Sequence, residues 1–158
     1  MIRFFKKILP ILVFFIDCCI PKRFSGYNVG FINFVRPKYK SDVGLVKHEM
    51  FHSVQFWKNP ATYCLGRWLK YLAFLPKRIV SWSKQKTFQF ECEAYGYQLF
   101  IYKKLNLVSQ KELFDLMHLF ARFVHEKYNI GDQYSTQDAF LAIRSYYLKF
   151  DMKDEIVV

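Results

Sequence analysis

The residues with the clearest chemical potential are two histidines and a glutamate in the segment His48-Glu49-Met50-Phe51-His52. Residues four apart on a helix share a face, so both imidazoles can direct a nitrogen at one metal ion about 2.0–2.1 Å away. Glu49 then lies beside the ion and can accept a proton from a metal-activated water. This spacing predicts zinc-dependent hydrolysis, with Zn²⁺ as cofactor, His48 and His52 as ligands, and Glu49 as general base and then general acid.

A catalytic zinc site needs a third protein ligand and one open coordination position. The metzincin arrangement is excluded, because it requires glycine and histidine where this chain has Gln55 and Lys58. Residue type alone leaves four downstream candidates for the third ligand, which are Glu91, Glu93, His118 and His125.

The segment Glu91-Cys92-Glu93-Ala94, which follows the two histidines on a later predicted helix, makes the chain resemble the gluzincin metallopeptidases. More narrowly, residues 47–57 and 91–98 are similar to small, uncharacterised metallopeptidases of bacteria and phages. The likeness spans about residues 26–104. It implies a peptide or protein substrate and a third zinc ligand at Glu91, with Glu93 as a surface charge or a partner of a ligand.

Other residues are expected to support such a site. Gln55 falls on the face of the metal ligands, where it either braces the site or lies at the helix edge. Tyr95 replaces an aspartate common in related enzymes, and its hydroxyl could bond a ligand or an oxyanion. His118 and His125 are surface side chains or oxyanion stabilisers. The resemblance also implies that a strand from Tyr27 to Val35 is an edge strand for an extended peptide.

The elements that must position these residues are indicated by apolar periodicity and capping residues. We expect the helix that carries His48 and His52 to begin at a Ser41 or Asp42 cap and to end at Asn59-Pro60. Capping boxes at Ser109 and Ser135 begin two further helices, separated by a break at Gly131. The remaining expected elements are a strand over 26–36, a helix over 61–75, a basic loop over 77–87 and a helix over 88–104.

We therefore predict one mainly helical α+β domain, a minimal zincin-like domain with a short N-terminal β-sheet. Its expected divisions are an apolar N-terminal segment (1–25), the zincin-like domain (26–150) and a C-terminal tail (151–158). Tyr63, Trp68, Tyr71 and Trp82 are assigned to the core.

The N-terminal segment contains an apolar run, Ile8 to Ile16, that resembles a short signal-peptide core. Pro10 and Asp17 interrupt the run, no small-residue cleavage site follows, and a membrane span needs about 20 residues. We expect a buried strand or a peripheral element here, and a cytoplasmic protein. Membrane association or export through this segment is the alternative.

Composition limits the remaining possibilities. With 53% hydrophobic and 20% aromatic residues, intrinsic disorder is excluded. The four cysteines, Cys18, Cys19, Cys64 and Cys92, form no C-x-x-C pair, so reduced and mostly buried thiols are expected. A net charge of +11 would attract phosphates, anionic lipid headgroups or acidic proteins without choosing among them, so peripheral contact with an anionic membrane is one possible interaction. The scattered cations do not form a nucleic-acid reader. Two alternatives to an enzyme remain: a non-catalytic zinc-binding protein, and a basic adaptor at a membrane surface or nucleic acid.

Overall fold

The computed structural model describes residues 10–18, 20–72 and 74–155. It confirms a mainly helical α+β fold with a small N-terminal sheet. In chain order the elements are β1 (Leu12–Phe15), β2 (Gly26–Val29), β3 (Ile32–Val35), η1 (Pro37–Tyr39), α2 (Val43–Lys58), α3 (Pro60–Trp68), η2 (Leu69–Tyr71), α4 (Lys77–Lys104), α5 (Gln110–Lys127) and α6 (Thr136–Glu155).

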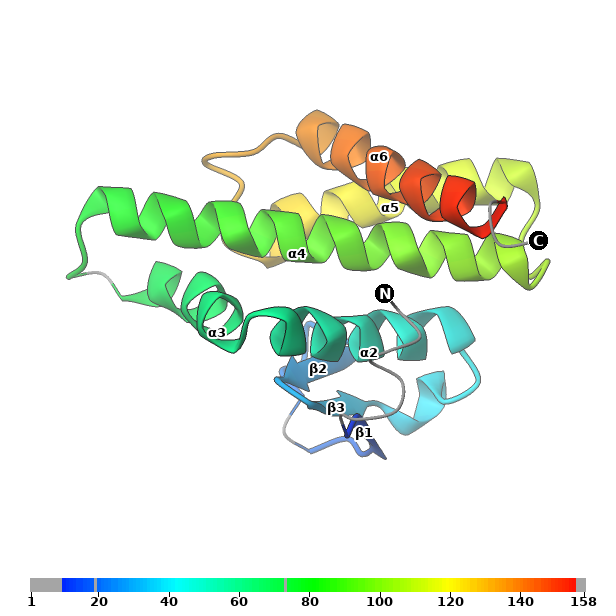
Figure 1. The fold of residues 1–158 in the computed structure, drawn as a ribbon, viewed down its shortest axis with the longest axis horizontal. Coiled ribbons are helices and arrows are strands. Elements are labelled where there is room, and N and C mark those ends of the chain that lie inside the picture. The colour runs from blue at the N-terminus through cyan, green and yellow to red at the C-terminus, as the bar shows by residue number, and fades with distance from the viewer. Residues whose placement is uncertain (1–9, 19, 73, 156–158) are drawn as a thin grey trace.

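The 28-residue helix α4 runs through the middle of the molecule, with α5 and α6 on one side and α2 and α3 on the other (Figure 1). The sheet lies beyond α2, on the side away from α4 (Figure 1). One face of α4 joins α5 and α6 in the main apolar core, which includes the fully buried Leu99, Leu113, Val124 and Ile143. The core thus fixes α4 from one side and leaves its other face for α2.

The strand expected over residues 26–36 is two strands, β2 and β3, joined by a two-residue turn. Gly30 in this turn has φ +67°, a conformation that favours glycine and suits a tight hairpin. β1 pairs in parallel with β3, which gives the strand order β1-β3-β2. The single-strand prediction was therefore wrong, although β2 does lie at an edge of the sheet.

Helix α2 begins and ends at the residues the sequence indicated. The Asp42 carboxylate accepts a hydrogen bond from the Leu45 amide (2.9 Å), and Asn59 caps the next helix by accepting from Thr62 N (3.0 Å). The Tyr102 hydroxyl of α4 donates to the same Asp42 carboxylate (2.7 Å). The first turn of α2 is thereby held against α4.

The basic loop expected over 77–87 is wrong, because α4 already begins at Lys77. The first turns of α4 pack on α3 through small polar groups, which an apolar pattern does not reveal. Ser83 and Thr87 are buried, and each donates a hydrogen bond to the Gly66 carbonyl at 3.0 Å. The preceding α3 ends at Trp68, earlier than the Leu75 expected.

The last two helices follow their predicted caps. Ser109 and Glu112 form a capping box, and Ser135 exchanges hydrogen bonds with Asp138 at the start of α6. The break expected at Gly131 lies between α5 and α6. Helix α6 continues to Glu155, five residues into the segment expected to be a tail.

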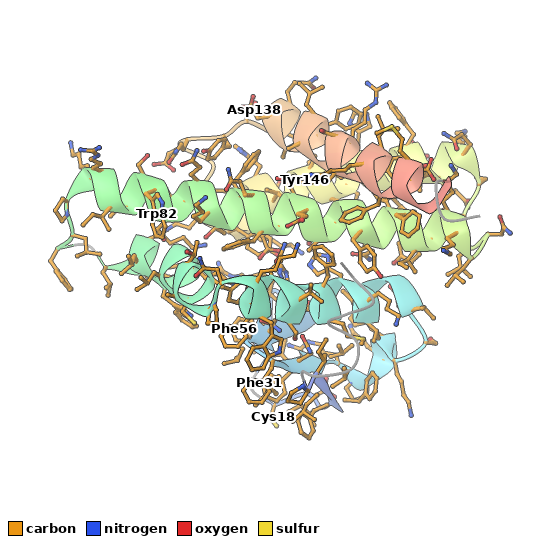
Figure 2. All side chains as sticks on the ribbon, in the orientation of Figure 1. Cys18, Phe31, Phe56, Trp82, Asp138 and Tyr146 are labelled. Atoms are coloured by element: carbon orange, nitrogen blue, oxygen red, sulfur yellow. The ribbon has the colours of Figure 1, made fainter. Side chains whose placement is uncertain are left out.

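The apolar run Ile8 to Ile16 contributes β1, although its residues 8 and 9 lie outside the described part of the chain. Within that part, none of the helices has both the length and the apolar character needed to cross a bilayer. The described thiols are free, but only Cys92 is buried, whereas Cys64 and Cys18 are exposed (Cys18 in Figure 2). The expectation of mostly buried thiols was therefore wrong for Cys18 and Cys64 and is confirmed for Cys92, while Cys19 lies outside the described residues.

Replacing Gly96 with alanine tests the contact between α4 and α6, where Tyr146 faces α4 (Figure 2). A Cβ at Gly96 would lie 2.7 Å from Tyr146 Cβ and 2.9 Å from the Tyr147 amide nitrogen. Because a backbone atom cannot move aside alone, we expect Gly96→Ala to lower the free energy of unfolding by about 1–3 kcal/mol, despite its better helix propensity. Urea unfolding measures this change.

The control is Ser145→Ala at an exposed position of α6, where the change should stay within about 0.5 kcal/mol. Equal unfolding midpoints for Gly96→Ala and the unchanged protein would contradict the close packing of the two helices.

Candidate metal centre

The paired histidines of α2 and the glutamate of α4 meet where these two helices pack together. His48 and His52 lie one turn apart on α2, and both side chains are buried. Glu91 lies opposite them on α4 and is fully buried. One ligand atom from each of the three residues lies within 4.8 Å of the other two. The structure therefore brings together the three residues expected to hold zinc.

The separations within this triad suit a bound ion. Glu91 Oε2 is 3.7 Å from His48 Nε2 and 3.4 Å from His52 Nε2. Ligands at about 2.0–2.1 Å from a tetrahedral zinc are about 3.3–3.4 Å from one another. A direct N–H···O hydrogen bond would be closer to about 2.9 Å. The triad is therefore spaced for a cation between its members.

The hydrogen-bond network around Gln55 determines which ring nitrogen carries the proton when His52 is neutral. Gln55 Nε2 donates to the Phe90 carbonyl (3.0 Å) and to Glu93 Oε2 (2.9 Å), so Gln55 Oε1 faces His52 Nδ1 at 2.7 Å. Because this oxygen can only accept, the proton of a neutral His52 lies on Nδ1. The lone pair on His52 Nε2 then points toward Glu91.

With His52 neutral, this lone pair faces the Glu91 carboxylate, an arrangement that needs a positive charge between the two groups: either a second proton, on His52 Nε2, or a metal ion. Both carboxylate oxygens of Glu91 are buried and accept no hydrogen bond from the described residues, and buried His48 Nδ1 likewise has no partner there. Burial of an ionised carboxylate without hydrogen bonds is costly. The donor set, two imidazoles and one carboxylate, is a known combination for catalytic zinc. The residues therefore fit a zinc ion.

Arg67 of α3 supplies part of the missing charge. Its Nη1 lies 3.0 Å from Glu91 Oε1, an ion pair that is not aligned as a hydrogen bond. Although burial opposes ionisation, His52 and Arg67 together hold the pKa of Glu91 well below its usual value. The Glu91 carboxyl is therefore ionised at neutral pH, as a metal ligand would need to be.

A buried polar chain fixes Arg67 and the sheet relative to α2. Arg67 Nη1 donates to the Tyr63 hydroxyl (3.0 Å), which donates to Asn28 Oδ1 (2.7 Å). Asn28 Nδ2 in turn donates to Asn33 Oδ1 (2.7 Å) and Ser53 Oγ (3.1 Å). Because every member is bonded, this chain ties α3, β2, β3 and α2 into one rigid support.

Glu49, the residue expected to be the general base, is buried. Its carboxylate lies against the backbone of Gly26, where any Cβ would collide with it. Burial raises the pKa of Glu49 to about 7, partly offset by the nearby His48. A carboxyl group with this pKa can both accept and release a proton near neutral pH.

Two cavities meet at Glu49. The smaller, of about 280 Å³, is also lined by His52 and by Gly26, Tyr27 and Asn28 of the edge strand β2. The larger, of about 470 Å³, is lined by His48 and extends along α4 and α5. Glu49 and the two histidines therefore border a cavity, whereas Glu91 borders neither of the two.

The other predicted site residues have separate positions. Glu93 accepts a hydrogen bond from Gln55, which in turn contacts His52, so Glu93 is linked to the triad through Gln55. The Tyr95 ring lies 4.4 Å from the His48 ring, and its hydroxyl is 3.5 Å from that of Tyr128. His118 is exposed and stacks on Phe140, and His125 Nδ1 contacts the Tyr134 carbonyl (2.9 Å). Neither of these histidines lines the cavities at Glu49, so the structure does not bring them to the site.

Sequence reasoning missed Arg67, Tyr63 and Asn28. None of them belongs to a motif, and the contacts that bring them to the site join distant residues, such as Tyr63 with Asn28, 35 positions apart, and Asn28 with Ser53, 25 positions apart. The one signal was a charge pattern, because the 41 residues from Met50 to Phe90 contain seven lysines and arginines and no acidic residue. Glu91 is the first acidic residue after this segment in the sequence, and Arg67 from the segment pairs with it.

Comparisons of the chain with protein-family models, curated proteins and solved structures found no match.

Replacing Gln55 with leucine tests its control of His52. The change removes the acceptor for His52 Nδ1–H while keeping a similar volume, so we expect zinc affinity to fall about 10–100-fold. Competition with a chromophoric chelator measures the dissociation constant. Gln133→Leu, at an exposed site, is the matched control and should bind zinc as the unchanged protein does. Equal affinity in the Gln55→Leu protein would contradict the assigned role of the amide.

Proposed function

We propose that this protein is a zinc-dependent hydrolase that cleaves peptide bonds. The observation that carries the proposal is the convergence of His48, His52 and Glu91 beside a buried Glu49 with a pKa of about 7. Three ligands together with an adjacent general base form the minimal set for metal-assisted hydrolysis. The resemblance of the two motifs to gluzincins favours a peptide as the substrate.

In the proposed mechanism, a bound zinc supplies Lewis acidity, lowering the pKa of a coordinated water and polarising the scissile carbonyl. His48, His52 and Glu91 would hold the ion, and the two histidines each border one of the cavities at Glu49. Glu49 takes a proton from the attacking water and later returns it to the leaving nitrogen. Edge strand β2, which lines the smaller cavity, offers its backbone to an extended peptide.

Zinc content and peptide hydrolysis together test this proposal. The unchanged protein should bind one zinc and cleave a mixed fluorogenic peptide library. Glu49→Gln should keep the zinc while hydrolysis falls about 10²–10⁴-fold, because only the proton acceptor is lost. His48→Ala should lose both the zinc and the hydrolysis. The matched control, His118→Ala at an exposed position of α5, should keep both.

Equal zinc in the unchanged and His48→Ala proteins would contradict the metal centre. Zinc that depends on His48, without any cleavage affected by Glu49→Gln, would instead support a non-catalytic zinc-binding protein.

A second proposed function, attachment to an anionic membrane, is favoured by the apolar tip. We use this name for the exposed side chains of the α3–α4 connection, which lies at one end of the molecule (Figure 1). Its members are Leu65, Trp68, Tyr71, Leu72, Phe74 and Ile79, with Phe74 82% and Trp68 53% exposed. The expectation that Trp68 and Tyr71 belong to the core was thus wrong.

The chemistry of the apolar tip matches a bilayer interface. Exposed aromatic and aliphatic side chains recur along this short segment, the Trp68 and Tyr71 rings lie 6.5 Å apart, and Lys77 and Arg78, which are neighbours in the sequence, are also exposed. Aromatic residues insert at the headgroup level, while cations are attracted to anionic lipids. The surrounding 41 residues without an acidic group add to this attraction.

Sedimentation with vesicles tests the membrane proposal. The protein should bind phosphatidylglycerol-containing vesicles more than pure phosphatidylcholine vesicles, and Trp68→Ser/Phe74→Ser should weaken binding at least about 10-fold through lost apolar burial. Leu105→Ser/Leu107→Ser, at exposed positions near the opposite end of α4, is the matched control. Binding that is unchanged by Trp68→Ser/Phe74→Ser, or that favours RNA over vesicles, would contradict attachment through this tip.

A further inference from the structure

The smaller cavity at Glu49 is lined by more basic residues than the one that pairs with the triad. Arg23, Arg67 and Lys70 all line it, and Glu49 is the one acidic side chain among its described lining residues. Arg67 is paired with Glu91, which leaves Arg23 and Lys70 to be accounted for.

Lys70 is a buried amine with a weak set of partners, and burial, together with the nearby Arg67, lowers its pKa to about 7, so an anion beside it would favour its charged form. It is 7% exposed, and its ammonium donates to the Thr87 hydroxyl (2.9 Å). Within the described part of the chain, no carboxylate lies within ion-pair distance of it. Its ammonium also lies 5.0 Å from the centre of the Tyr71 ring. One neutral hydrogen bond and one ring contact do not offset the cost of burying an ammonium group. Lys70 therefore lacks a compensating negative charge.

Arg23 is exposed and has a different environment. Its guanidinium lies 4.9 Å from the centre of the Phe24 ring, a contact that holds a cation without neutralising it. Among the described residues it too has no carboxylate partner. The cavity thus has one buried and one solvent-accessible cation, both available to an anion.

We propose that this cavity is a carboxylate subsite, in which Arg23 and Lys70 receive an acidic side chain or the free C-terminal carboxylate of a peptide substrate. This inference rests on the proposed peptidase function and names its substrate class. Because Glu49 and His52 line the same cavity, a carboxylate held there lies close to the bond to be cleaved. The space of about 280 Å³ suits a side chain or chain end.

Binding measurements on the non-hydrolysing Glu49→Gln protein test the subsite without depending on turnover. The probes are N-acetylated pentapeptides of alanine with a central aspartate or asparagine, each prepared as the free acid and as the C-terminal amide. Calorimetry gives their dissociation constants. We expect at least about a 10-fold preference for a carboxylate, equivalent to about 1.4 kcal/mol. The aspartate amide against the asparagine amide reports a side-chain site, and the asparagine acid against its amide reports a chain-end site.

In the same background, Arg23→Gln/Lys70→Met should reduce this preference to within about twofold. The methionine keeps the apolar stem of Lys70 without its charge, and thermal unfolding confirms that the variant is folded. Arg144→Gln/Lys111→Met, which removes two exposed cations elsewhere, is the matched control and should keep the preference.

Two outcomes would overturn the subsite: equal binding of all four peptides, or a carboxylate preference that survives in Arg23→Gln/Lys70→Met. Failure of the proposed peptidase has a different signature. The zinc-loaded unchanged protein would then bind the preferred peptide with the same selectivity and cleave none of the four, so the anion site would stand without the enzyme.

Discussion

The structure depends on one buried electrostatic arrangement, in which the Glu91 carboxylate faces two imidazoles that are spaced too widely for hydrogen bonds. Without a cation between them, ligand lone pairs and a carboxylate oppose one another in a site that water does not screen. Arg67 compensates only one of the two carboxylate oxygens. A metal ion would therefore stabilise the packing of α2 on α4 as well as perform chemistry, because its ligands come from both helices.

Helix α4 is long enough to pack in the apolar core with one face and to carry Glu91 on the other. This explains how a chain of 158 residues can hold a buried polar site. One face of the helix lies in the apolar core with α5 and α6, and the other carries Glu91 toward α2. Tyr102, further along α4, bonds the Asp42 cap of α2, so the same two helices are joined near the metal centre and at the start of α2. Ligands on two such rigid helices lose little freedom when they bind an ion.

Acidic and basic residues are distributed unevenly at the candidate metal centre. The acidic groups next to the two histidines are the proposed ligand Glu91 and the proposed base Glu49, and the charged residues between these two in the sequence are all lysines and arginines. Their pKa values diverge because of their surroundings: Glu91 is held ionised by His52 and Arg67, whereas burial raises the pKa of Glu49. Two buried carboxylates can thus serve as ligand and proton acceptor at one pH.

The sequence by itself determined the α2 histidine pair, the Asp42 and Ser109 caps and the mainly helical class, because these follow from spacing and hydrogen bonds within a few residues. It also indicated Glu91, but only through the resemblance of its motif. Tertiary structure alone decided the start of α4 at Lys77, the turn at Gly30, and the contacts of Arg67 and Lys70. Those features depend on groups distant in the chain that meet only after packing, such as Ser83 and Thr87 bonding Gly66, and no local pattern encodes such meetings.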